Sequence, residues 1–286
     1  MDDNTGRHRS TWLRATASAA AAAALLGGCG AGDDNKAAEP SPSASAGSTA
    51  PTASGSPTPT ASAASTGGGT AAALTPFEAD PAEVPRTRRQ AERLAQAVVL
   101  QPQAWGDGFR AQQPAASTPR TVAVLDTQCR WQRRPLPKTV LASLSRYSEL
   151  PGAGGKGTLK VTAAITVHAT VRDADQQLST TLEEPLRCPV QQVRTDEQIS
   201  GLLSNASPYG QGNNTYSDDQ VVEIGSYVTG ASAQTYRWFV TRLGTVTVAV
   251  SVMGATGYKP DELVQYASHG TTTMLSRVES ELGGKS

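Results

Sequence analysis

LKVTAAITVHATV, residues 159–171, places an apolar side chain at every second position, from Leu159 to Val171. The residues between them, such as Lys160 and His168, are mostly polar or small. Alternate side chains of a β-strand point to opposite faces, so this pattern predicts a strand with one buried face and one wet face. Such strands are typical of an antiparallel sheet that is packed on one side. We therefore expect an antiparallel sheet at the centre of the domain, with His168 on its surface.

Helices and further strands are predicted on both sides of this segment. Thr87 with Gln90, and Asp173 with Gln176, have the three-residue spacing of a capping box at the start of a helix. Pro185 is expected to end the second of these helices. The expected elements are a helix over 87–101, strands over 120–133, 139–150 and 159–171, helices over 173–185 and 195–203, a loop over 205–219, strands over 221–228, 235–242 and 245–253, and a helix over 260–282.

The order of these elements predicts an α+β fold, an antiparallel β-sheet with helices packed on one face. We expect a single globular domain over residues 86–283, since about 200 residues are enough to bury one hydrophobic core. Residues 29–85 are rich in Ser, Thr, Pro, Ala and Gly, as in PSPSASAGSTAPTASGSPTPTASAAST, residues 40–66. This composition buries too little apolar surface to offset the entropy of ordering, so we expect a disordered tether.

The N-terminal segment has the layout of a secretory signal. An arm that contains several arginines precedes the short apolar run ATASAAAAAALLGGC, residues 15–29. Its last four residues, Leu26-Gly27-Gly28-Cys29, resemble the lipobox of bacterial lipoproteins. The resemblance implies that residues 1–28 are removed as a lipoprotein signal peptide and that the Cys29 thiol carries a diacylglyceryl anchor with acyl chains such as palmitate. The domain is then expected on the extracytoplasmic side of the cell membrane.

Two other interpretations of this segment remain open. A transmembrane helix needs about 20 apolar residues, and the apolar run is shorter than that. An ordinary secretory signal with a later cleavage site is compatible with the small residues that continue past Cys29. A diacyl anchor would hold firmly, because each buried methylene contributes about 0.8 kcal/mol and two chains bind far better than one. We expect the lipid-anchored form.

Cys129 and Cys188 are the two cysteines that remain besides Cys29 in a chain with three. In an oxidising compartment outside the membrane they have only each other as partners, so we expect a disulfide between them. In the chain-entropy model, a bridge that closes a loop of about 60 residues stabilises a fold by about 4 kcal/mol. A pair of buried free thiols is the alternative.

Charge and motif content point away from nucleic acid binding and from enzymatic chemistry. The chain carries 25 basic and 25 acidic side chains, and a near-neutral surface does not favour nucleic acid as a partner. His168 and His269 have no second histidine or cysteine at metal-ligand spacing, so no zinc site is predicted and both are expected at the surface. No catalytic set is recognised, and we expect neither enzymatic activity nor a cofactor.

Two weaker motifs match ligand-binding patterns only in part, and one carboxylate stands in a predicted strand. The loop GAGGKG, residues 152–157, matches GxGxxG, but a predicted strand follows it where a phosphate-binding loop requires a helix. The pair Asp218-Asp219 lacks the regular ligand spacing of a calcium loop. Glu223 stands next to apolar strand positions, so its burial would be informative about function.

A series of short motifs accompanies the lipobox and the tether along the chain. They are Trp105-Gly106-Asp107-Gly108-Phe109 after the first helix, Cys129, and Arg187-Cys188-Pro189 before the later strands. Together, over most of residues 86–282, they resemble actinobacterial lipoproteins related to the extracellular sensor domain of PknH-type receptor kinases. The resemblance implies a mixed sheet and helix fold with a groove and a ligand-sensing role. The kinase sensor carries two disulfides, whereas this domain has cysteines for one.

These observations predict a cell-surface lipoprotein with a non-catalytic, extracellular ligand-binding or partner-binding domain. Its partners would be the membrane, through Cys29, and an unidentified extracellular small molecule or envelope protein. A secreted hydrolase with an unconventional site is one alternative, and it predicts a deep pocket with a perturbed acid or base such as Glu223. A structural cell-envelope protein is another, and it predicts no pocket and a sheet face used for self-association.

Overall fold

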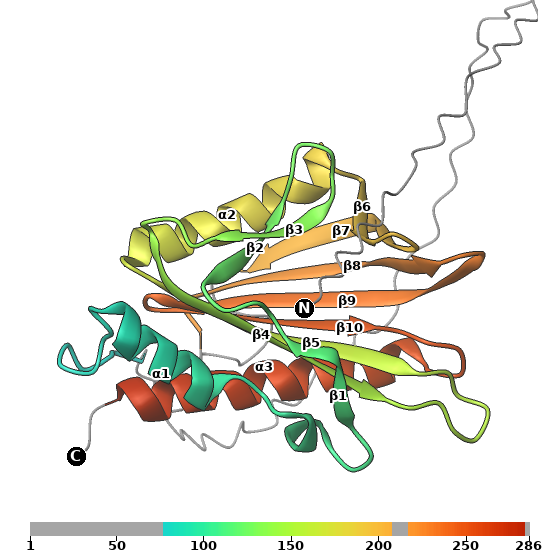
Figure 1. The fold of residues 1–286 in the computed structure, drawn as a ribbon, viewed down its shortest axis with the longest axis horizontal. Helices are drawn as coiled ribbons and strands as arrows, with labels where there is room; N and C mark the ends of the chain where they lie inside the picture. Colours follow the sequence, from blue (N-terminus) through green and yellow to red (C-terminus); the bar gives the residue numbers. More distant parts are fainter. Residues whose placement is uncertain (1–76, 208–216, 284–286) are drawn as a thin grey trace, which may run out of the picture. The chain divides into compact units, whose positions relative to one another are not determined.

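The computed structural model describes residues 77–207 and 217–283 (Figure 1). The predicted signal segment, Cys29 and most of the predicted tether lie outside the described residues, as does most of the predicted loop over 205–219. The helices are α1 (Arg88–Val98), the 3-10 helix η1 (Pro102–Trp105), α2 (Val171–Arg187) and α3 (Pro260–Leu282). The strands are β1 (Arg110–Ala116), β2 (Thr121–Leu125), β3 (Trp131–Pro135), β4 (Val140–Leu150), β5 (Leu159–His168), β6 (Val190–Arg194), β7 (Glu197–Ser207), β8 (Asp219–Thr229), β9 (Ser232–Leu243) and β10 (Val246–Met253). Among these helices, none is both long and apolar enough to cross a membrane.

Eight strands form one antiparallel sheet in the order β1-β4-β5-β10-β9-β8-β7-β6, and β2 and β3 form a separate hairpin. The register is regular at the centre of the sheet, where Ile165 of β5 lies opposite Leu144 of β4 and Val248 of β10. The segment 159–171 therefore supplies a central strand. The predicted fold class, α+β with an antiparallel sheet in one domain, is confirmed.

The main hydrophobic core lies between one face of the sheet and the helices α1 and α3. In Figure 1 these helices, cyan and red, lie together below the sheet. The alternating apolar sets of β5 and β10 point toward them, as the period of two predicted. The buried side chains at the centre of this core are Leu94, Val98, Leu159, Ile165, Val248, Val250, Leu263, Met274 and Val278.

Helix α2 lies against the opposite face of the sheet (Figure 1), a placement that the expected packing of helices on one face did not include. Its apolar stripe needs a partner, and Leu178 finds one in Val221 of β8 and Val240 of β9. The helix begins after Thr170, whose hydroxyl accepts a hydrogen bond from a backbone N–H in the first turn. Pro185 lies inside the helix and does not end it, contrary to the prediction.

Two further predictions of secondary structure are corrected by strand pairing. The segment 195–203 is not a helix, because β6 and β7 form a hairpin and β7 pairs with β8. Its apolar residue Ile199 packs against Tyr227 and Tyr236, which a helix at the sheet edge would not allow. The segment 120–133 is not one strand but the β2–β3 hairpin. In both cases, pairing with residues distant in the chain outweighs local propensity.

Gly270 of α3 is the point at which this helix approaches η1 and the sheet most tightly. A Cβ atom at this position would lie 2.6 Å from Cη2 of Trp105 and 3.1 Å from Cγ2 of Val250. Overpacking costs about 1–3 kcal/mol and exceeds the helix propensity gained by alanine. We expect Gly270→Ala to lower the free energy of unfolding by about 1–2 kcal/mol in urea denaturation. The exposed Ser276→Ala in the same helix is the control, and equal stability of the two variants would contradict this packing.

Candidate ligand-binding groove

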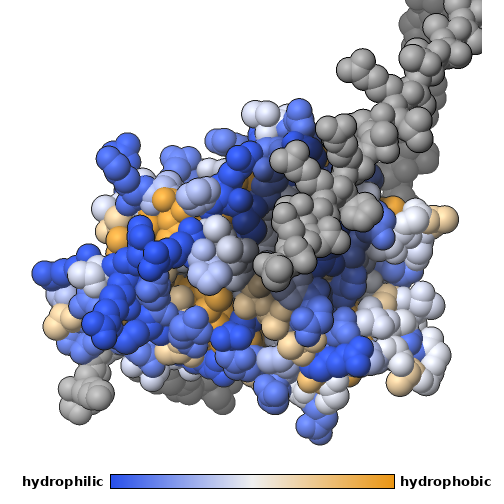
Figure 2. Space-filling view, in the orientation of Figure 1, coloured by the Kyte–Doolittle hydropathy of each residue, from blue (hydrophilic) through white to orange (hydrophobic). Residues whose placement is uncertain are grey.

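A groove with a volume of about 540 Å³ lies on the face of the sheet opposite α1 and α3. Its walls come from α2 and the β2–β3 hairpin, and its floor comes mainly from β4, β5, β9 and β10. The face of the molecule drawn in Figure 2 is mainly hydrophilic, and apolar side chains gather on it between α2 and α1. The groove is therefore enclosed by elements from distant parts of the chain.

Small side chains on the floor of the groove leave space for a ligand above the sheet. They come from the polar face of β5, which the sequence pattern predicted to be wet, and from the matching face of β10. Facing strands with short side chains leave space above them, and their hydroxyl groups can form hydrogen bonds with a ligand. The residues of this floor are Thr162, Ala164, Thr166, Thr247, Ala249 and Ser251.

Two tryptophans join the hairpin to the sheet at one side of the groove. Trp131 of β3 and Trp238 of β9 form an edge-to-face pair with ring centroids 5.4 Å apart. The indole N–H of Trp131 donates to Oε1 of Gln191 on β6 at 2.9 Å. Aromatic pairs of this geometry contribute about 0.5–1.5 kcal/mol beyond the area they bury. They position the hairpin above the floor and also line the groove.

The two walls of the groove are covalently joined at one end. The sulfur atoms of Cys129, in the turn of the hairpin, and Cys188, immediately after α2, are bonded to each other. The guanidinium of Arg187 adds two hydrogen bonds, from Nη1 to the carbonyl oxygen of Asp126 at 2.9 Å and from Nη2 to that of Leu125 at 3.2 Å. These contacts hold the last turn of α2 against the hairpin.

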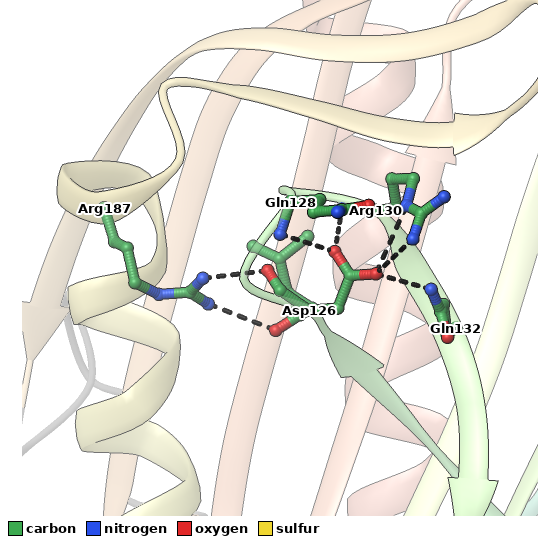
Figure 3. A network of polar contacts seen from close by, with 6 residues as sticks. Asp126, Gln128, Arg130, Gln132 and Arg187 are labelled. Atoms are coloured by element: carbon green, nitrogen blue, oxygen red, sulfur yellow. Dashed lines mark hydrogen bonds and ion pairs between the residues drawn. The ribbon is translucent and has the colours of Figure 1, made fainter.

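The Asp126 side chain shapes the hairpin turn, as Figure 3 shows. Its carboxylate accepts hydrogen bonds from the backbone N–H groups of Gln128 and Arg130, both at 2.9 Å, and from the side chains of Arg130 and Gln132. The bond from the Arg130 N–H is the main reason why the pKa of Asp126 lies below its usual value. This turn directs Cys129 toward α2.

Arg133 of β3 places a guanidinium group at the groove. Its Nε and Nη2 atoms donate to Oγ1 and the carbonyl oxygen of Thr121 at 2.9 and 2.6 Å, and Nη1 approaches Oγ of Ser145 at 3.4 Å. All of these acceptors are neutral, and burial lowers the pKa of Arg133. No carboxylate of the described residues forms an ion pair with it. Sequence reasoning assigned no role to this residue.

His168 is buried, and its predicted surface position is wrong. Its Nε2 lies 2.8 Å from Oε1 of Gln177 on α2, and the same oxygen accepts a hydrogen bond from Thr247 at 2.7 Å. Since that oxygen only accepts, Nε2 carries the ring proton. Burial lowers the pKa of His168, so the ring stays neutral and acts as a structural link between β5 and α2. The correction follows from α2 covering this face of the sheet.

Glu223 of β8 is fully buried. The sequence alone left its burial open. Its Oε1 accepts a hydrogen bond from the Ser204 hydroxyl at 2.8 Å, and Oε2 has no partner in the described part of the chain. Burial raises the pKa of Glu223 to about 7. Glu184 of α2 lines the groove, and burial together with the charge of Glu223 raises its pKa to about 7 as well. The two carboxyl groups therefore form a pair that resists ionisation, and nothing in the sequence pattern linked them.

The remaining residues singled out in the sequence have structural positions. His269 is exposed, as predicted, with Nε2 2.8 Å from the carbonyl oxygen of Ala104. Asp218 and Asp219 both pair with Arg242. The glycine-rich loop over 152–157 connects β4 to β5, so a strand follows it as expected. Within residues 77–207 and 217–283, no group of three or more potential metal-ligating side chains is found.

Comparison with solved structures gives a distant structural likeness. No family model matches the chain, and no curated protein matches it by sequence. Among solved structures, the domain is similar to the crystal structure of the extracellular domain of PknH from Mycobacterium tuberculosis. The two are 12% identical in sequence, the match covers 65% of this chain and 97% of that chain, and the TM-score is 0.40. A likeness at this TM-score and identity places the chain in no family.

Proposed function

We propose that this protein is an extracytoplasmic lipoprotein whose domain binds a small, partly apolar ligand without chemical change. The groove is the observation that supports binding, because ligand sites are concave and mostly apolar with a few polar groups that orient the ligand. Its volume of about 540 Å³ lies in the usual range for such sites. The disulfide and the tryptophan pair hold its walls in place before a ligand arrives, which lowers the entropic cost of binding.

Attachment to the membrane rests on the lipobox at Leu26-Gly27-Gly28-Cys29. We expect Cys29→Ala to move the protein from the membrane fraction to the soluble extracytoplasmic fraction of the producing cells. Mass spectrometry of the wild-type N-terminus should find a diacylated cysteine as the first residue. An unmodified N-terminus that retains residues 1–28 would overturn this part of the proposal.

Binding in the groove is tested with the neutral, apolar fluorescent probe N-phenylnaphthylamine. Ala164 lies on the floor, so Ala164→Phe should fill the groove and lower probe affinity by about tenfold or more, the loss of a few buried methylene contacts. Ala111→Phe on the exposed face of β1 is the matched control and should bind as the wild type does. Equal probe binding by all three proteins would place the binding elsewhere and contradict the proposal.

A hydrolase is the second candidate function, and the carboxyl pair of Glu184 and Glu223 is the observation that favours it. A carboxylic acid with a pKa near neutrality is suited to general acid catalysis. Glu223, however, is not among the residues that line the groove, so only Glu184 would meet a substrate. Turnover of an ester or glycoside substrate that Glu184→Gln abolishes, and Glu183→Gln leaves intact, would favour this candidate over binding.

A further inference from the structure

Arg133 is a charged residue of the groove. No carboxylate in the described part of the chain forms an ion pair with it. Thr121 and Ser145 hold its guanidinium through neutral oxygen atoms. A half-buried cation without a counterion is costly, because burial removes water and no opposite charge replaces it. A negatively charged ligand would supply the counterion that the described residues do not provide.

The hydrogen bonds of Arg133 do not use all the N–H groups of its guanidinium. Nε and Nη2 use one edge to hold Thr121, and Nη1 has a single long contact with Ser145. Each terminal nitrogen carries two hydrogens, so Nη1 and Nη2 each retain an N–H group that forms no hydrogen bond with the residues the structure describes. A guanidinium with N–H groups available on both terminal nitrogens can bind both oxygens of a carboxylate or a phosphate.

We infer that the ligand of the groove is an amphipathic anion, whose carboxylate or phosphate head is bound by Arg133 and whose apolar body lies against the tryptophan pair. This inference rests on the proposed binding function and names the chemical class of its ligand. The apolar part of the groove that would receive the body is formed by Val124, Trp131, Ala164, Trp238 and Met253.

The other charged groups of the groove do not offer a competing site for the head group. Arg194 already forms an ion pair with Glu197 at 3.0 Å. The carboxylate of Asp173 accepts a hydrogen bond from Thr170 and lies in the positive first turn of α2. Glu184 resists ionisation for the reasons given above, so it does not repel an anion below neutral pH. Arg133 is therefore the charged group of the groove that the described residues leave unmatched.

The test compares four ligands with a ten-carbon chain by isothermal titration calorimetry at pH 6, each at a concentration at which it is dissolved as a monomer. They are decanoate, decyl phosphate, decanol and decyltrimethylammonium. The wild-type protein should bind one or both anions about ten- to hundredfold more tightly than decanol, the range expected for hydrogen bonds with a charged group. The relative affinity of decanoate and decyl phosphate then identifies the head group.

Arg133→Gln should remove the preference for the anions and leave the affinity for decanol unchanged. Arg134→Gln is the matched control, because Arg134 is the next residue of β3 and is exposed. An unchanged preference in Arg133→Gln, or an equal loss in Arg134→Gln, would overturn the inference. The wild-type comparison needs no variant, so binding of decanol without preference for the anions also overturns it. Failure of the wild type to bind any of the four would overturn the proposed function itself.

Discussion

Replacing both Cys129 and Cys188 by serine is expected to lower the free energy of unfolding by about 4 kcal/mol. The two cysteines are 59 residues apart in the sequence, so the bridge removes much of the conformational freedom of the unfolded chain. For a domain of this size, the loss corresponds to a decrease in melting temperature of about 10 °C. Urea and thermal unfolding of the double variant under oxidising conditions would measure it.

The same change should weaken binding in the groove, because the disulfide joins the hairpin to the end of α2. The hydrogen bonds of Arg187 remain in the double variant, so we expect the fold to persist while the walls of the groove become less ordered. Wild-type protein with a reducing agent is the control and should behave as the double variant does. Equal melting temperatures with and without the bridge would show that it adds no stability.

Glu223→Gln is expected to stabilise the domain by about 3 kcal/mol at pH 8 and by almost nothing at pH 4. The pKa of Glu223 is raised from 4.5 to about 7 by burial, so the folded chain keeps a proton that the unfolded chain has lost. The resulting stability is present in full below pH 4.5 and is lost as the pH rises to about 7. The difference between these pKa values corresponds to about 3 kcal/mol, and glutamine avoids the loss because it never ionises.

The measurement is the difference in unfolding free energy between variant and wild type across this pH range. Taking the difference removes the contribution of His168, whose lowered pKa makes stability fall as the pH drops below 6.5, and it includes the effect of the Glu223 charge on the titration of Glu184. Glu183→Gln, at an exposed position of α2 beside Glu184, is the control and should change stability by less than about 0.5 kcal/mol at every pH. A flat difference for Glu223→Gln would mean that Glu223 is ionised or hydrated in the folded protein.

Strands with strict alternation could be predicted from the sequence, and irregular ones could not. The apolar sets of β5 and β10 are continuous, so each alone indicates which face is buried. The segment 195–203 has apolar residues at spacings that fit a helix as well as a strand, and its pairing with β8 settles the matter. The sequence does not indicate the reversal at Asp126, because hydrogen bonds from Gln128 and Arg130 form this turn and no glycine or proline pair marks it.

Little of the groove could be predicted from the sequence. Glu223 is unusual in the sequence because a carboxylate stands among apolar positions of one strand. Glu184 and Arg133 carried no such signal, since charged residues on a helix and on a short strand are usually solvated. They become functional candidates only when α2 and the hairpin fold over the sheet.

The sequence by itself determined the buried face of the sheet and the cysteines available to bond within the domain, because side-chain alternation and cysteine number are properties of the chain. Only the tertiary structure decided that the polar face of β5 is the floor of a groove and that His168 is buried beneath α2. The physical reason is that a polar strand face looks the same in the sequence whether water or another segment covers it. What covers it depends on contacts between residues far apart in the chain.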